Sequence, residues 1–162
     1  MNSDTPKPTT AAEWRKPREE GVNVPLPSGN WARIRPADIM TMIKQGTIPD
    51  LLSAVAVKAV WSEQDPSEIG EQFELAEKYD DLMRIVLPAV FAEPKIALDG
   101  QAPKDDEITI EDLDLADRTA AFNLALSGVG TMRRFRDEQV KRLGLVSNGE
   151  NVWAATEQDS AD

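Results

Sequence analysis

The sequence contains no cysteine and no histidine. The absence of cysteine excludes disulfide bonds and thiolate nucleophiles, and the absence of both residues excludes the usual Cys/His zinc sites. Without histidine, the chain also lacks the general base that titrates most readily near neutral pH. We therefore expect no enzyme activity and no cofactor.

Sequence motifs of catalytic and metal sites are also missing. The chain has no G-x-S-x-G segment around a serine nucleophile and no glycine-rich loop that would cradle a phosphate. Carboxylates are dense between Asp105 and Asp117, but they lack the D-x-D-x-D-G pattern that wraps a loop around Ca²⁺. We interpret this acidic run as the start of a helix, where the helix dipole favours negative charge.

Long apolar runs are absent, and basic residues are few. No run approaches the ~20 residues that span a bilayer, and the first residues, MNSDTPKP, do not resemble a signal peptide. The cytoplasm is therefore the expected location.

The 29 acidic and 18 basic residues give a formal net charge of −11, which repels nucleic acid. A protein with a basic surface is the easier partner, although the charge can also serve solubility alone.

At 162 residues, the chain is long enough for one domain with a hydrophobic core. Prolines and polar residues mark residues 1–21 as a flexible N-terminal arm, in which a single helical turn is predicted near residues 11–16. Residues 22–144 are predicted to form the single domain. Residues 145–162, with four acidic residues and no basic one, are predicted to be an acidic disordered tail. Trp14 either packs the arm onto the core or is exposed for a partner.

Residues 22–35 predict a short β-hairpin, because apolar and polar residues alternate on both sides of Pro27-Ser28-Gly29, a turn-forming sequence. The alternation separates the hairpin into two faces. The residues Val22, Val24 and Leu26 share one face of the first strand, and on the second strand Trp31, Arg33 and Arg35 lie opposite Ala32 and Ile34. Two strands alone are marginally stable, so the hairpin needs a helix or a second copy to pack against.

Periodicity and capping signals predict helices at about residues 36–45, 50–61, 68–87, 114–127 and 131–143. Pro36 is expected at the first helical position, and Pro88 is expected to end or kink the third helix. The second helix is apolar nearly all round, which places it at the centre. Residues 91–106 are predicted to be a long exposed connection. The expected fold is mainly α, a bundle of about five helices with a short N-terminal β-hairpin.

Two groups of residues are candidates for binding another protein. The basic residues Arg133, Arg134 and Arg136 either pair with the acidic run at 105–117 or form a docking surface. The candidate contact residues are Trp31, Arg33, Arg35 and Met40, because tryptophan and arginine are enriched at interface hot spots and methionine adapts to varied partners.

The sequence resembles the tail assembly chaperones of long-tailed, siphovirus-type bacteriophages of actinobacterial hosts over residues 22–142. The resemblance is carried by LPSGNWARIRPADIMTMIKQGTIPDLL, a long helical middle, and the segments DEITIEDLDLADRTAAFNLALSGV and RFRDEQ. Its two clearest motifs are G-x-I-P at Gly46–Pro49 and I-x-I-E-D-L at Ile108–Leu113. Neither motif carries catalytic chemistry.

This resemblance implies a helical protein that binds and shields the tape-measure protein and leaves as the tail tube polymerises. It also implies a longer, frameshifted form in related systems, and self-association is a further expectation. One alternative is a structural virion protein, such as a head–tail connector, neck or tail component. Another is an acidic inhibitor or DNA mimic. Of these three roles, only the chaperone role makes the chain a transient partner of an apolar protein.

Overall fold

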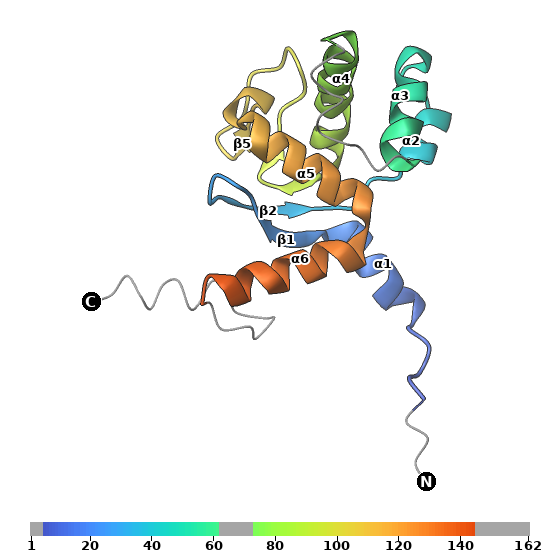
Figure 1. Cartoon of the computed structure of the whole chain (residues 1–162), viewed down its shortest axis with the longest axis vertical. Coiled ribbons are helices and arrows are strands. Elements are labelled where there is room, and N and C mark those ends of the chain that lie inside the picture. The colour runs from blue at the N-terminus through green and yellow to red at the C-terminus, as the bar shows by residue number, and fades with distance from the viewer. Residues whose placement is uncertain (1–4, 62–72, 145–162) are drawn as a thin grey trace, which may run out of the picture.

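The computed structural model describes residues 5–61 and 73–144 (Figure 1). Its helices are α1 (Ala11–Glu20), α2 (Ile39–Lys44), α3 (Asp50–Trp61), α4 (Phe73–Val90), the short 3-10 helix η2 (Ile110–Asp112), α5 (Leu115–Ser127) and α6 (Val129–Arg142). Its strands are β1 (Val22–Pro25), β2 (Trp31–Ile34), β3 (Phe91–Glu93), β4 (Lys95–Ile96) and β5 (Glu107–Ile108). The prediction of a mainly α fold is confirmed. The predicted tail at 145–162 and the predicted helix start at 68–72 lie outside the described residues.

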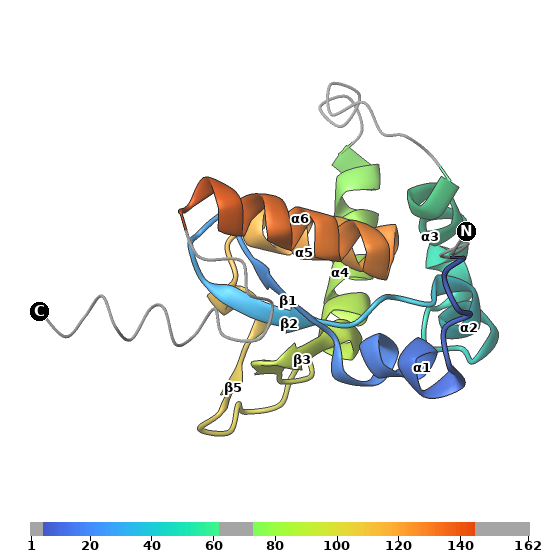
Figure 2. The ribbon, with the colours of Figure 1, turned by 90° about the horizontal axis from the view of Figure 1, so that it is seen from below.

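The helices pack around a small sheet rather than only around one another. In Figure 1, β1 and β2 lie between α6 on one side and α4 and α5 on the other, and α6 packs against β1. Figure 2 shows α1 beside α2 and α3 at one end of the molecule, away from β5. The simple bundle expected from the sequence is therefore replaced by helices on two sides of a sheet.

Strands β1 and β2 pair in antiparallel fashion, with Val22 opposite Ile34 and Val24 opposite Ala32. Directly opposed residues of an antiparallel pair share a face, so these four apolar side chains form one surface. All four are buried in the core, whereas Trp31 and Arg33 on the other face are partly exposed. The division into two faces follows the alternation in the sequence.

The segment 91–106, predicted to be a long exposed connection, is partly structured. Strand β3 pairs with β2, with Phe91 opposite Ile34, and makes the sheet three-stranded in the order β1-β2-β3. Strand β4 pairs in parallel with β5, and Ile96 is buried. The prediction was wrong because Phe91 and Ile96 supply apolar side chains to the core in spite of the neighbouring proline and glycine residues.

The N-terminal arm contains a ten-residue helix, α1, instead of a single helical turn. A capping box starts it: the Thr10 hydroxyl accepts a hydrogen bond from the Glu13 amide, and the Glu13 carboxylate accepts one from the Thr10 amide. Gly21 ends it with φ +82°, and a Cβ there would lie 2.9 Å from the Ile34 carbonyl oxygen. The close approach and the positive φ both require glycine.

Three details of the predicted helices are corrected. Helix α2 starts at Ile39 and not at Pro36, because the Asp38 side chain caps it by accepting a hydrogen bond from the Thr41 amide at 3.1 Å. Helix α3 is not central, since Leu51 is 77% exposed and the helix packs on α2 and α4. Helix α4 continues past Pro88 to Val90, which costs little because Pro88 lies in the last turn.

The buried carboxylate of Asp117 joins the hairpin turn to α5. Its side chain accepts hydrogen bonds from the Ser28 amide at 2.9 Å and from the Ser28 hydroxyl at 2.5 Å. Its own amide donates to the capping side chain of Asp114 at 2.8 Å. Asp117 is 2% exposed, whereas Ser28 is exposed, so a buried carboxylate of α5 holds the surface turn of the hairpin on the helix.

We expect Asp117→Ala to lower the free energy of unfolding by about 1.5–3 kcal/mol, because a hydrogen-bonded carboxylate is lost and two Ser28 donors lose their partner. Urea unfolding followed by circular dichroism measures the change. The matched control is Asp105→Ala, an exposed loop aspartate, which should change stability by less than about 0.5 kcal/mol. Equal effects of the two substitutions would contradict the role given to Asp117.

Candidate functional site

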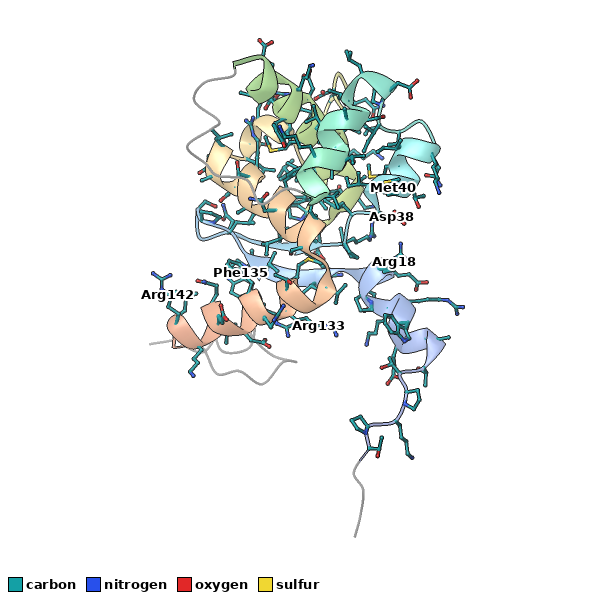
Figure 3. All side chains as sticks on the ribbon, turned by 45° about the vertical axis from the view of Figure 1, so that its right-hand side comes forward. Arg18, Asp38, Met40, Arg133, Phe135 and Arg142 are labelled. Atoms are coloured by element: carbon teal, nitrogen blue, oxygen red, sulfur yellow. The ribbon has the colours of Figure 1, made fainter. Side chains whose placement is uncertain are left out.

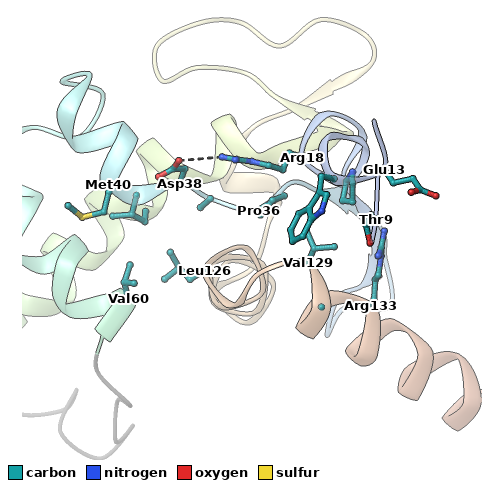
Figure 4. A pocket seen from close by; sticks show the side chains of 15 residues that line it. Thr9, Glu13, Arg18, Pro36, Asp38, Met40, Val60, Leu126, Val129 and Arg133 are labelled. Carbon is teal, nitrogen blue, oxygen red and sulfur yellow. Dashed lines mark hydrogen bonds and ion pairs between the residues drawn. The ribbon is translucent and has the colours of Figure 1, made fainter. Parts of the chain in front are cut away.

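A pocket with a volume of about 730 Å³ lies where α1, the start of α2, the ends of α3 and α5, and the start of α6 meet (Figure 4). We call it the α1 groove. Its apolar lining includes Trp14, Pro17, Ile39, Met40, Val60, Leu126 and Val129. Its charged lining consists of Glu13, Arg18, Asp38 and Arg133. Helices far apart in the sequence therefore build one largely apolar depression.

Large apolar side chains of the α1 groove are open to solvent. Trp14 is 71% exposed and Met40 is 48% exposed, and Val60 is also exposed. An exposed tryptophan beside a methionine is typical of a surface that binds a partner, because both provide large contact areas and methionine adapts its shape. Of the two interpretations of Trp14 left open by the sequence, the structure favours exposure over packing onto the core.

Helix α1 is held in place by polar contacts at its C-terminal half. The Arg18 guanidinium pairs with the Asp38 carboxylate at 3.3 Å, which links α1 to α2. The Arg35 Nε donates a hydrogen bond to the Glu19 carbonyl oxygen at 2.9 Å, and Pro17 is buried. Figure 3 shows Arg18 and Asp38 between α1 and α2, with Met40 close by on α2. The wall that carries Trp14 is therefore anchored to the sheet and to α2.

The two carboxylates of the α1 groove cap helices. The hydrogen bond from the Thr10 amide lowers the pKa of Glu13, and the Thr10 hydroxyl adds to this effect. The hydrogen bond from the Thr41 amide lowers the pKa of Asp38, with smaller contributions from the Thr41 hydroxyl and from Arg18. Arg133 differs from them, because it is exposed and forms no ion pair with any described residue.

Of the four contact residues predicted from the sequence, Met40 alone lines the α1 groove. Trp31 and Arg33 lie on the partly exposed face of β2, where Arg33 pairs with Glu93 at 2.8 Å. Arg35 donates a hydrogen bond to the Glu19 carbonyl oxygen, on α1. Trp14 takes the place of Trp31 in the groove, and the signal that locates it is the capping-box pattern T-x-x-E at Thr10–Glu13, which predicts a helix around it.

The predicted pairing of the basic residues of α6 with the acidic run at 105–117 is wrong for the residues that the structure describes. Glu111 pairs with Arg84 at 2.7 Å, and Arg136 pairs with its neighbour Asp137 at 3.0 Å. In Figure 3, Arg133 and Arg142 project from α6, whereas Phe135, which packs against the core, lies toward the sheet. The sheet separates α6 from the acidic run, so the charges do not meet.

Two further features concern metals and membranes. Within residues 5–61 and 73–144, no group of three or more carboxylates is placed to hold a metal ion. None of the helices described here has both the length and the apolar character to cross a bilayer.

Acidification is expected to weaken both helix caps of the α1 groove. A carboxyl whose pKa is lower in the folded state stabilises the fold above its ordinary pKa, and this contribution is lost as the pH falls through the folded value. The ordinary values are 4.5 for Glu13 and 3.8 for Asp38. The loss therefore begins below about pH 4.5 and continues below pH 3.8.

Carboxyl-detected NMR titration measures the two pKa values directly. Both should lie below the ordinary values, and the amide signals of Glu13 and Thr41 should shift with the same midpoints. In Thr10→Ala, the pKa of Glu13 should rise while that of Asp38 stays unchanged, which makes the variant a matched control. Midpoints at or above the ordinary values would show that the caps are absent in solution.

Comparison with known proteins places the chain in a family. No curated protein and no solved structure matches the chain. The model of a family of unknown function, DUF7391, matches residues 12–147, a range that includes the sheet and most of the α1 groove. Since the match covers most of the sequence, the chain belongs to the DUF7391 family.

Proposed function

We propose that this protein is a binding module without enzyme activity, and that its α1 groove receives an apolar segment of another protein. The observation that carries the proposal is the exposure of Trp14 and Met40 at the edge of a largely apolar pocket. The pocket volume lies within the range of about 300–1,000 Å³ that is typical of sites enclosing a ligand. A buried anchor side chain of a partner fits such a site.

The resemblance to phage tail assembly chaperones supports a more specific form of the proposal. In this form the protein acts in the host cytoplasm, binds apolar segments of the tape-measure protein, and is released as the tail tube forms. The three-stranded sheet and the helices on its two sides serve as the scaffold that holds the α1 groove. The residues permit this role, because they provide apolar contact and no catalytic group.

Physical arguments favour shielding as the activity of such a surface. Each Å² of apolar area removed from water contributes about 25 cal/mol, so covering an exposed apolar segment gives affinity without sequence-specific chemistry. The net charge of −11 keeps complexes apart from one another by repulsion. Complexes of this kind do not aggregate before the partner is assembled into the tail.

Binding of purified tape-measure fragments tests the site. Trp14→Ala should weaken binding by about 2 kcal/mol, roughly 30-fold in Kd, as expected for an interface hot spot. Met40→Ala should weaken binding less, because methionine contributes a smaller apolar area. The dissociation constants are measured by isothermal titration calorimetry, and circular dichroism checks that each variant remains folded.

Two matched variants make this result specific. Trp31→Ala truncates the same residue type on the partly exposed face of β2, and Leu115→Ala removes an exposed apolar side chain outside the α1 groove. Neither should change the Kd. If Trp31→Ala weakens binding and Trp14→Ala does not, the contact surface is the hairpin face with Trp31, Arg33 and Arg35, and the groove assignment fails.

The composition of the phage particle tests the biological role. A chaperone that leaves during tail assembly should be absent from purified virions and present in the lysate of infected cells. Quantitative mass spectrometry of both samples measures this. Stoichiometric copies in the mature particle would contradict the chaperone role and support a structural neck, connector or tail component. Capture of a nucleic-acid-binding enzyme in place of the tape-measure protein would support an acidic inhibitor.

A further inference from the structure

One side of helix α3 is apolar and open to solvent. Leu51 is 77% exposed, Val57 is 37% exposed, and Ala54 between them is exposed as well. The helix packs on α2 and α4, and in Figure 1 α2 and α3 form the edge of the molecule beyond α4. At about 100° of rotation per residue, the three exposed residues lie within an arc of about 120°. A surface helix usually carries charged residues on its outer side, so this apolar side is unusual.

The two ends of this exposed side carry opposite charges. Asp50 lies in the first turn of α3 and Lys58 in the last turn, and both are exposed. Among the described residues, neither forms an ion pair. We call the five exposed residues the α3 face: Asp50, Leu51, Ala54, Val57 and Lys58. Along the helix, the α3 face therefore runs from acidic through apolar to basic.

The α3 face is arranged symmetrically about Ala54. Asp50 lies four residues before Ala54 and Lys58 four residues after it. Leu51 lies three residues before Ala54 and Val57 three residues after it. Each apolar residue thus has an apolar counterpart at the same separation from Ala54, and the acidic residue has a basic one.

A face with this symmetry is complementary to a second copy of itself. In a pair of identical surfaces related by a twofold axis, residue i of one copy contacts residue j of the other, and j contacts i. With two antiparallel α3 helices and the axis at Ala54, Asp50 of each copy lies level with Lys58 of the other, and Leu51 lies level with Val57. A parallel pair would instead place like charges level with each other.

The residue at the axis allows the two helices to approach closely. Packed helices lie about 8–10 Å apart, and the spacing depends on the side chains at the contact. Ala54 is the smallest side chain of the α3 face, so it permits a spacing near the lower end of this range. The larger Leu51 and Val57 then cover the contact on either side of the axis.

The acidity of the whole chain does not prevent this contact, although it repels a second copy. At physiological salt, charge effects are screened beyond about 8 Å, so the charges on the α3 face outweigh distant ones among the total of −11. One helix pair is a small interface, below the ~1,200 Å² that stable complexes bury, so the association is weak and depends on concentration.

We propose that the α3 face binds the α3 face of a second copy in an antiparallel, twofold-symmetric dimer. The occupant follows from the pattern of charge and size about Ala54, which a second copy matches at every position. The proposal goes beyond the proposed function and does not depend on it. The α1 groove takes Val60 from α3, which is not part of the α3 face, so each chain of the dimer keeps its groove.

Sedimentation equilibrium of the full-length protein tests the dimer. At about 0.15 M salt, the mass should rise from monomer to dimer between about 5 and about 500 µM, as expected for a small interface. Ala54→Glu should abolish the rise, because two carboxylates meet at the axis. Ala116→Glu makes the same change at an exposed alanine of α5 and should leave the rise unchanged. A constant monomer mass, or an Ala54→Glu variant that dimerises like the unmodified protein, overturns the proposal.

Charge exchange tests the antiparallel order. Asp50→Lys and Lys58→Glu should each raise the Kd of the dimer by about 10-fold, because two attractive pairs become repulsive. An equimolar mixture of the two variants should associate again, since the lysines of one chain then face the carboxylates of the other. Circular dichroism checks that each variant remains folded. A mixture that associates no better than either variant alone overturns the antiparallel arrangement.

Cross-linking locates the axis, because the chain has no cysteine of its own. Ala54→Cys places two thiols next to each other in the dimer and should give a disulfide-linked dimer under mild oxidation. Ala116→Cys, the same change outside the α3 face, should remain largely monomeric. Equal cross-linking of the two variants would show that the contact is not centred on Ala54, which overturns the proposal.

A separate pair of measurements distinguishes this dimer from partner binding at the α1 groove. Trp14→Ala should leave the dimer unchanged, and Ala54→Glu should leave binding of a tape-measure fragment unchanged. If no fragment binds, the proposed function fails while the dimer stands on its own measurements. If Leu51→Ala weakens fragment binding and the chain stays monomeric, the α3 face receives the partner and not a second copy, which overturns this proposal.

Discussion

The antiparallel pairing of β1 and β2 determines where the α1 groove lies. Because Val22 pairs with Ile34, the residues that precede β1 and those that follow β2 emerge at the same end of the sheet. Helix α1 ends at Gly21, against the Ile34 carbonyl, and α2 begins only a few residues after Ile34. The Arg18–Asp38 ion pair then joins two helices that are distant in sequence. The groove is thus a consequence of the hairpin register.

The opposite wall of the groove depends on the connection between α5 and α6. Asp117 fixes α5 on the hairpin turn through Ser28, and Gly128, with φ +87°, reverses the chain between the two helices. Leu126 and Val129 on either side of this reversal line the groove. A positive φ at that position favours glycine because other side chains rarely adopt it. One buried carboxylate and one glycine therefore place the second wall.

Local signals in the sequence predicted much of the scaffold, and tertiary pairing accounts for most of the rest. The alternation in the hairpin and the helix cap at Asp114 depend on neighbouring residues, so the sequence alone predicts them. The pairing of Phe91 with Ile34 joins residues 57 positions apart and has no local signature. The α1 groove likewise has no local signature in the sequence, because five helices contribute residues to it. The full length of α1 is not predicted, because the prolines of the N-terminal arm, Pro6, Pro8 and Pro17, argue against a helix more strongly than the capping box at Thr10–Glu13 argues for one.

The distribution of charge changes what the net charge implies about partners. Acidic side chains gather around Arg84, where Glu111 and Asp80 hold the guanidinium and raise the pKa of Arg84. Helix α4, which carries Arg84 and Asp80, lies across the sheet from α6 (Figure 1), and α6 has five basic and two acidic residues. Screening at physiological salt limits charge effects to about 8 Å, so a segment in the α1 groove responds to the charged residues that line it, Glu13, Arg18, Asp38 and Arg133, rather than to the total of −11.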